Sequence, residues 1–265
     1  MEIRESGLAE AGTAEAAIAA VICAAGSSSR MGGLKKEYCP LPNSKSLTVL
    51  GSAVSAFAAV PAIETIVIAV PADSASGEAA ARKALPPELL ADSARPRIVF
   101  VSGGNTRRAS VHNALSLLAA YKPEHCARPD YVLIHDGARP WISPSLIEQI
   151  IAAVKKYRAV IPLLPLTETP KETDAPLAAT DAVDSNAAAI YIKQHLKRAT
   201  TGTAQTPQAF AFPEILQAHE QSAEYERSEN IEYTDDAEVW ASFIGPVAVI
   251  PGSPENRKIT VPGDL

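Results

Sequence analysis

Short apolar runs recur along the chain and alternate with longer periodic segments. Runs rich in Val, Ile and Ala lie at residues 18–25, 64–71, 97–101, 131–134 and 159–164. Their length and composition predict buried β-strands.

The segments between these runs repeat apolar residues every three or four positions or are rich in Ala, which predicts helices. They lie near residues 47–57, 75–85, 107–118 and 144–154. Ser143 followed by Pro144 is a typical helix start, and Asn105 or Thr106 can cap the third helix. Because strands and helices alternate, we expect an α/β, Rossmann-like fold, with a mostly parallel twisted sheet covered by helices on both faces.

The alternation breaks after the fifth strand. Residues 165–197 are polar and contain short β-type pieces such as 189–192, so we expect an extended β-arm. Beyond the arm, residues 213–221 are expected to be helical and the charged residues 222–233 to form a loop. A capped helix opens at Thr234–Glu238, and residues 247–250 form a last strand.

We expect residues 1–17 to form an N-terminal extension and residues 18–265 to form one domain. The 47% hydrophobic content is ample for a core, and the net charge of −6 argues against general nucleic-acid binding. No membrane span or secretory signal is apparent. Three cysteines with no Cys-x-x-Cys spacing favour the reducing cytoplasm.

The loop after the first strand carries the first chemical signal. Residues 24–32 read Ala-Ala-Gly-Ser-Ser-Ser-Arg-Met-Gly, and Lys35 and Lys36 follow. Small residues let backbone amides approach a ligand closely, and cations neutralise the negative charge of a phosphate. The loop matches neither the Walker pattern nor Gly-x-Gly-x-x-Gly, where Ser28 replaces a glycine, so a plain turn with solvated Arg30 and Lys36 remains an alternative.

Four further motifs follow in order. Residues 103–110 read Gly-Gly-Asn-Thr-Arg-Arg-Ala-Ser, 135–140 read His-Asp-Gly-Ala-Arg-Pro, 205–210 read Gln-Thr-Pro-Gln-Ala-Phe, and 256–260 read Asn-Arg-Lys-Ile-Thr. A carboxylate at a strand end suits a metal or substrate contact. A structural role is the alternative for His135, and a solvated surface position is the alternative for Arg198.

Together these motifs resemble those of the 2-C-methyl-D-erythritol 4-phosphate cytidylyltransferases, a family of sugar-phosphate nucleotidylyltransferases. The resemblance covers residues 18–265 and implies transfer of CMP from CTP to the sugar phosphate, with Mg²⁺ as cofactor and a homodimer formed through the arm. It implies catalytic roles for Arg30, Lys36, Arg198 and Lys258. It implies substrate contacts by Ala24, Ala25, Gly26, Gly104, Asn105, Ser110, Asp136, Arg139, Thr169 and Thr206, with Asp136 as the metal ligand.

Two other readings remain open. Ribitol-5-phosphate cytidylyltransferases are similar but favour Val-Arg-Pro-Phe after His-Asp, where this chain has Gly-Ala-Arg-Pro-Trp. A catalytically silent nucleotide-binding protein is suggested by Ser28, by Glu37, which stands where the family has Gln, and by the extra charged loop expected at 222–233. If Ser28 must adopt a positive φ, the cost is about 1 kcal/mol.

Overall fold

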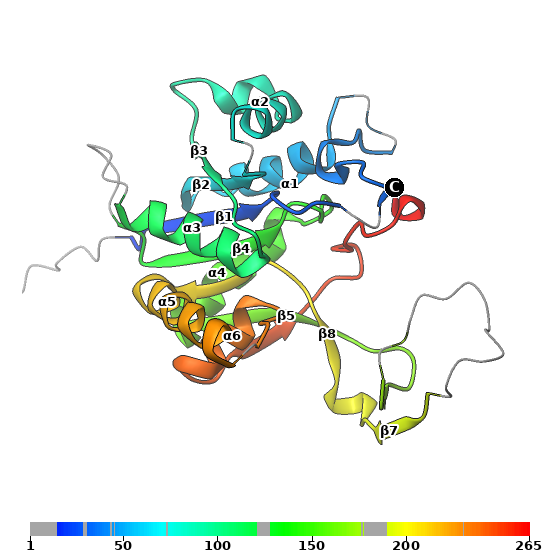
Figure 1. The fold of residues 1–265 in the computed structure, drawn as a ribbon. Coiled ribbons are helices and arrows are strands. Elements are labelled where there is room, and N and C mark those ends of the chain that lie inside the picture. The colour runs from blue at the N-terminus through cyan, green and yellow to red at the C-terminus, as the bar shows by residue number, and fades with distance from the viewer. Residues whose placement is uncertain are drawn as a thin grey trace, which may run out of the picture.

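Strands and helices alternate along the chain, and eight of the described strands form one mixed, mostly parallel sheet (Figure 1). The computed structural model describes residues 15–28, 31–42, 44, 46–72, 74–120, 128–175, 177, 190–229 and 231–265. The strands of the sheet are β1 (Ile18–Cys23), β2 (Ile63–Val70), β3 (Arg97–Ser102), β4 (Tyr131–Asp136), β5 (Ala159–Pro165), β8 (Gly202–Ala204), β9 (Gln208–Ala211) and β10 (Ala248–Pro251). The predicted fold class is therefore confirmed.

The strand order is β10-β5-β9-β4-β1-β2-β3, with β8 added beside β5. Strand β9 runs antiparallel to both β4 and β5 and lies between them, whereas β1 is parallel to β2 and β4. The chain thus moves outward from β1 in both directions. The gap between the loops that follow β1 and β4 is the usual ligand position in such sheets.

Helices cover both faces of the sheet. They are α1 (Val49–Ala58), α2 (Ser74–Ala84), α3 (Arg107–Ala120), α4 (Pro144–Tyr157), α5 (Phe212–Glu229) and α6 (Asp236–Phe243), with short 3₁₀ turns η2 (Lys36–Tyr38), η3 (Pro87–Leu90), η4 (Arg198–Thr200) and η5 (Pro262–Asp264). Alternate residues of β1 divide between the two faces. Ile18, Ala20 and Ile22 pack with α1, α2 and α4, while Ala19 and Val21 pack with α3, α5 and α6.

The predicted helix caps are present. Ser143 Oγ accepts from the Leu146 amide at 3.2 Å, and Thr106 Oγ1 accepts from the Ala109 amide at 3.0 Å. At α6, Asp235 accepts from the Glu238 amide at 2.9 Å while Glu238 accepts from the Thr234 amide at 2.8 Å. These reciprocal bonds satisfy amides that a helix start otherwise leaves open.

The expected loop at residues 222–233 is wrong, because α5 continues to Glu229. In this charged part of the helix, Glu226 forms an ion pair with Arg108 of α3. Tyr225 of α5 also meets the Phe243 ring of α6 edge-on, with centroids 5.7 Å apart. The charged segment is therefore the second half of a helix that packs against α3 and α6.

The expected arm leaves the body after β5 and returns at β8 (Figure 1). It contains β6 (Lys171–Thr173) and β7 (Ile192–His195), paired antiparallel. The strand predicted at 189–192 is thus shifted toward the C-terminus, and residues 178–189 lie outside the described part of the chain, as do residues 1–14 and Cys126. At the arm's base, Pro165 pairs with Gly202, so the two ends of the arm lie side by side.

A directed chain of hydrogen bonds fixes the end of β4. His135 Nε2 lies 3.2 Å from the Arg139 carbonyl oxygen, which can only accept, so Nε2 carries the proton and Nδ1 accepts. Thr206 Oγ1 donates to that Nδ1 at 3.0 Å and accepts from the Asp136 amide at 3.1 Å. His135 is fully buried, and this arrangement gives it a structural role.

The segment after β10 crosses back to the N-terminal part of the chain. Ile259 packs with Leu41 and Val49, and the Arg257 guanidinium lies 3.9 Å from the centroid of the Trp141 ring. The last residues therefore lie beside the region that follows β1. Within the described residues, none of the helices combines the length and apolar character that crossing a bilayer requires.

Burial of His135 predicts an acid-sensitive fold. Burial lowers the pKa of His135 to about 4, despite the neighbouring Asp136 carboxylate. Because the unfolded imidazole titrates near 6.5, the stabilisation is complete above that pH and is lost as the pH falls toward about 4. We expect this residue to remove ~1.4 kcal/mol of unfolding free energy per pH unit in that window.

Urea unfolding of the protein and of His135→Gln between pH ~7 and ~5 measures this contribution. The glutamine amide can keep a donor and an acceptor, and other groups titrate alike in both proteins. The variant should lose stability less steeply with acid. Equal slopes for the two proteins would contradict the expected role.

Candidate active site

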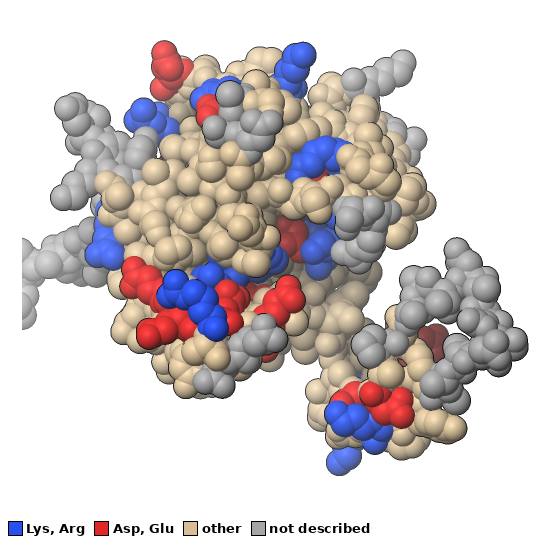
Figure 2. Space-filling view, in the orientation of Figure 1, with Lys and Arg blue, Asp and Glu red and all other residues tan. Residues whose placement is uncertain are grey.

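A pocket of about 490 Å³ opens at the carboxyl ends of β1, β3 and β4. Residues within five segments line it: 23–28, 36–37, 104–110, 136–138 and 258–260. These segments carry four of the motifs identified in the sequence, so the fold brings together residues that are more than two hundred positions apart. Figure 2 shows basic and acidic side chains close together on this face of the body and on the arm.

Asp136, the last residue of β4, is the centre of the site. Lys258 Nζ lies 2.9 Å from Asp136 Oδ2, and Arg139 Nε lies 3.5 Å from the same oxygen. Arg107 Nε lies 3.6 Å from Oδ1. Three cations from three separate segments therefore surround one carboxylate.

These cations keep Asp136 ionised. Burial raises the pKa of this carboxyl group, but Lys258, Arg107 and Arg139 outweigh burial and hold the pKa well below its usual range. The carboxylate offers hard oxygen ligands for a cation at the pocket wall. Within the described residues no group of three or more His, Cys, Asp and Glu side chains could hold a metal. A single carboxylate suits Mg²⁺, which takes its remaining ligands from phosphates and water.

The loop after β1 has a conformation of its own. Ser28 has a φ of 52°, the strained left-handed region considered above, and its hydroxyl donates to Glu37 Oε2 at 3.2 Å. Lys35 Nζ lies 3.4 Å from the same oxygen and also donates to the Gly26 carbonyl. Ser28, which stands where Gly-x-Gly-x-x-Gly has a glycine, and Glu37, which stands where the family has Gln, are therefore bonded to each other and tie the loop to η2.

The residues predicted in this loop have different positions. Ala25, Gly26 and Lys36 line the pocket, with Lys36 largely buried. Ala24 is fully buried behind them, and its amide donates to the Ala69 carbonyl at 2.9 Å. Arg30 lies outside the described residues.

The turn after β3 closes the opposite wall. A Cβ on Gly103 would lie 2.3 Å from the Cβ of Ala25, so only glycine lets this turn approach the first loop so closely. Ser110 Oγ accepts from the Gly104 amide at 3.1 Å and donates to the Thr106 carbonyl at 2.9 Å. Gly104, Asn105 and Ser110, which the resemblance gives as substrate contacts, all line the pocket.

The Gln-Thr-Pro-Gln run before and within β9 holds the site from behind. Gln205 bonds both the amide of Ser253, at 3.0 Å, and its carbonyl, at 2.8 Å, on the segment that carries Lys258. Gln208 Oε1 accepts from the Asp236 amide at 3.0 Å at the start of α6. Thr206 is buried, and its hydroxyl bonds to His135 and Asp136. Each polar side chain of the run fixes a different segment.

Arg139 also joins separate segments behind the pocket. Its Nη1 donates to the Asn256 carbonyl at 2.7 Å, and Asn256 Nδ2 donates to the Thr206 carbonyl at 2.8 Å. Burial lowers the pKa of Arg139, and Asp136 opposes that shift. Neither Arg139 nor Thr206 is among the residues that line the pocket, although both contact Asp136.

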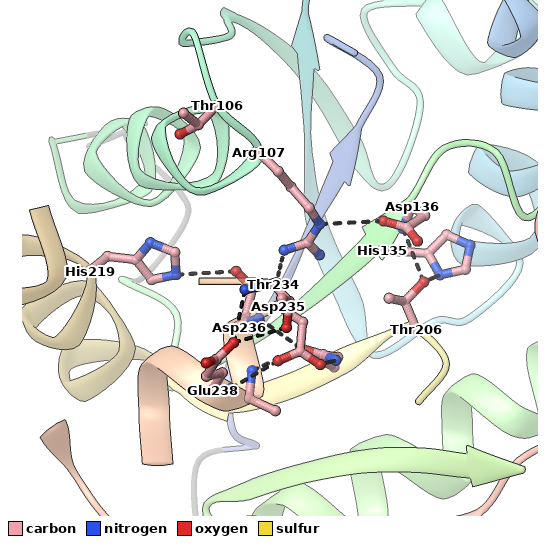
Figure 3. Close-up of polar contacts among 12 residues, drawn as sticks. Thr106, Arg107, His135, Asp136, Thr206, His219, Thr234, Asp235, Asp236 and Glu238 are labelled. Carbon is pink, nitrogen blue, oxygen red and sulfur yellow. Dashed lines mark hydrogen bonds and ion pairs between the residues drawn. The ribbon is translucent and has the colours of Figure 1, made fainter. Parts of the chain in front are cut away.

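Three residues not singled out from the sequence extend the site inward (Figure 3). Arg107 Nη1 lies 2.8 Å from Asp236 Oδ2, and His219 Nε2 lies 3.2 Å from Asp236 Oδ1. The Arg107 side chain thus points between Asp136 and Asp236. Arg107 is the arginine of the Gly-Gly-x-x-Arg-x-x-Ser motif, and that position was the available signal. No sequence spacing links it to Asp236 or His219.

Thr169 and Arg198, both exposed on the arm, are not brought to this pocket within the chain. Arg198 Nη1 donates to the Thr167 carbonyl at 2.9 Å, which joins the two ends of the arm.

Comparison with known proteins supports the relationship suggested by the motifs. The model of the 2-C-methyl-D-erythritol 4-phosphate cytidylyltransferase (IspD) family matches residues 18–265. The protein of that name from Pelotomaculum thermopropionicum is 34% identical over 251 residues, 94% of this chain and 91% of the relative. The bifunctional enzyme IspD/IspF of Bartonella henselae is 34% identical over 249 residues, 94% of this chain but 55% of the relative. The chain spans about half the length of such bifunctional relatives.

Solved structures are similar over the same extent. The 4-diphosphocytidyl-2C-methyl-D-erythritol synthase of Anaerococcus prevotii has 28% sequence identity and a TM-score of 0.68, covering 93% of this chain and 92% of the other. The 2-C-methyl-D-erythritol 4-phosphate cytidylyltransferase of Francisella tularensis has 25% identity and a TM-score of 0.66, covering 93% and 95%. Since sequence, fold and the motifs that line the pocket agree over residues 18–265, the chain belongs to the IspD family.

Proposed function

We propose that this protein transfers CMP from CTP to 2-C-methyl-D-erythritol 4-phosphate, giving 4-diphosphocytidyl-2-C-methyl-D-erythritol and pyrophosphate in isoprenoid precursor biosynthesis. The observation that carries the proposal is the convergence of Lys36, Lys258 and Arg107 with one ionised carboxylate, Asp136, on a single pocket. Family membership supports the choice of substrates. The function of the additional half of the bifunctional relatives is not attributed to this chain.

The reaction joins two anions and requires no covalent nucleophile on the protein. A phosphate oxygen of the sugar phosphate attacks the α-phosphorus of CTP, the new P–O bond forms, and the bond to pyrophosphate breaks. Catalysis therefore consists of aligning the two phosphates and balancing their charge. Lys36, which lines the pocket, would stabilise the α-phosphate and the leaving pyrophosphate, and we assign the same task to Arg30. Lys258 would neutralise the attacking phosphate and the triphosphate together.

Asp136 would hold Mg²⁺, whose charge would offset that of the triphosphate and orient it. Lys258 and Arg139 contact Oδ2 of this carboxylate, while Oδ1 has only the longer contact with Arg107 among the described residues. The carboxylate therefore has one oxygen that is less engaged than the other.

Cytosine would be read by the turn after β3. The backbone of Gly104 and Asn105 lies at the pocket wall opposite Ala25 and Gly26, and the Ser110 hydroxyl holds the turn in shape. Backbone donors and acceptors in a rigid turn distinguish a pyrimidine edge because their positions do not adapt to the wrong base.

We further propose a homodimer in which the arm reaches the partner's pocket. Exposed apolar side chains on the arm, Tyr191 at 67% and Ile192 at 53%, provide surface for such a contact. Thr169 and Arg198 would then bind the phosphate of the sugar in the partner's site. The cysteine content favours a cytoplasmic location.

Pyrophosphate release with CTP and Mg²⁺ tests the substrate. We expect release with 2-C-methyl-D-erythritol 4-phosphate and none with ribitol 5-phosphate. Release with ribitol 5-phosphate alone would leave the mechanism but change the substrate. A folded protein that binds CTP and releases no pyrophosphate with either would be a silent nucleotide binder.

Lys36→Ala should lower kcat about a hundredfold, a loss of ~3 kcal/mol of transition-state stabilisation. The reason is that the substitution removes a cation from the pocket wall. Steady-state kinetics and thermal unfolding measure the two effects separately, and stability should change little. Lys155→Ala, an exposed lysine near the end of α4, is the charge-matched control and should behave like the parent. An active Lys36→Ala enzyme would refute the role.

Arg198→Ala should raise KM for the sugar phosphate about tenfold with a smaller effect on kcat, because one contact with its phosphate is lost. Lys197→Ala, the neighbouring exposed cation, is the control. If sites are shared, mixing Arg198→Ala with Lys36→Ala chains restores activity through mixed dimers, in which one site has both residues. Activity equal to the sum of the two parents would exclude shared sites.

A further inference from the structure

Arg107 lies between two buried carboxylates and is closer to that of Asp236 than to that of Asp136 (Figure 3). Its Nη1 is 2.8 Å from Asp236 Oδ2, whereas its Nε is 3.6 Å from Asp136 Oδ1. The shorter contact is within hydrogen-bonding distance and the longer one is not. The guanidinium, at the pocket wall, is therefore held toward Asp236 and away from Asp136 Oδ1.

Contacts with neighbouring residues fix Asp236 in the position from which it holds Arg107. Its side chain is 1% exposed, its amide donates to Gln208 Oε1 at 3.0 Å, and His219 Nε2 lies 3.2 Å from its Oδ1. Burial raises the pKa of Asp236, but Arg107 and His219 outweigh burial, and the pKa remains below its usual range. A buried, ionised carboxylate keeps a strong attraction for its one guanidinium partner.

The position of Arg107 matters because of the second oxygen of Asp136. Lys258 and Arg139 both contact Oδ2, so Oδ1 is the oxygen that faces Arg107. A guanidinium bonded to Oδ1 would compete with a divalent cation for the same lone pairs. At 3.6 Å the guanidinium makes no hydrogen bond to that oxygen.

We propose that Asp236 is a positioning residue: it holds Arg107 away from Asp136 Oδ1 and so leaves this oxygen to bind the divalent cation that accompanies CTP. His219 supports Asp236 from the far side. The inference rests on the proposed function, since it concerns the metal of that reaction. It adds α5 and α6, which do not line the pocket, to the elements on which metal binding depends.

Asp236→Asn tests the proposal, because it keeps the size of the side chain and removes its charge. Arg107 should then move to Asp136, the remaining carboxylate. We expect Mn²⁺, bound together with a non-hydrolysable CTP analogue, to bind about tenfold more weakly. Electron paramagnetic resonance of free Mn²⁺ measures this binding at equilibrium, independently of turnover.

Two further variants distinguish this cause from a general loosening of the helices. Glu226→Gln removes the partner of Arg108, the next residue of α3, and should leave Mn²⁺ affinity unchanged. Arg107→Gln combined with Asp236→Asn removes the competing cation and leaves no unpaired buried charge. This double variant should recover part of the Mn²⁺ affinity that Asp236→Asn loses.

Equal Mn²⁺ affinity in Asp236→Asn and the parent would overturn the inference. So would a double variant as weak as Asp236→Asn, or an equally large loss in Glu226→Gln. A parent protein that binds Mn²⁺ and releases pyrophosphate while Asp236→Asn matches it leaves the proposed function intact. A parent that neither binds Mn²⁺ with the analogue nor releases pyrophosphate overturns both.

Discussion

The buried carboxylate of Asp136 is the constraint on which the site depends. An ionised carboxylate in this position is costly unless cations and hydrogen-bond donors surround it. The cations come from the start of α3, from the loop after β4 and from the segment after β10. Since all three must reach one side chain, the requirement draws distant parts of the chain to the same edge of the sheet. The cluster that makes Asp136 tolerable is also the cationic wall that a triphosphate needs.

Strand β9 supplies the scaffold behind this cluster. It lies between β4 and β5, and the polar residues around it point in different directions. Gln205 holds the segment of Lys258, Thr206 holds the end of β4, and Gln208 holds the start of α6. One short run therefore sets the relative positions of three segments. A substitution in it would be felt at a distance, because hydrogen bonds in a buried network depend on one another.

Much of this arrangement could be predicted from the sequence, and the exceptions have physical reasons. The pattern of apolar residues predicted six of the eight strands of the sheet, because burial imposes a local period on each element, but not the short strands β8 and β9. Four of the five motifs lie on segments that line the pocket, whereas residues 205–210 do not. The ion pair between Arg107 and Asp236 joins residues of two helices, and no local period records such a pairing. The sequence predicts a loop for the charged half of α5, and the structure differs because Arg108, the partner of Glu226, lies on another element.

The base of the arm has a consequence for how this family can diverge. Strands β5 and β8 pair directly, so the arm departs from the sheet and rejoins it at adjacent positions. A segment inserted in this way behaves as an exchangeable module. Its length and sequence can drift, or be grafted from a relative, while the junction keeps the same geometry. Changes in the arm can thus accumulate separately from changes in the pocket.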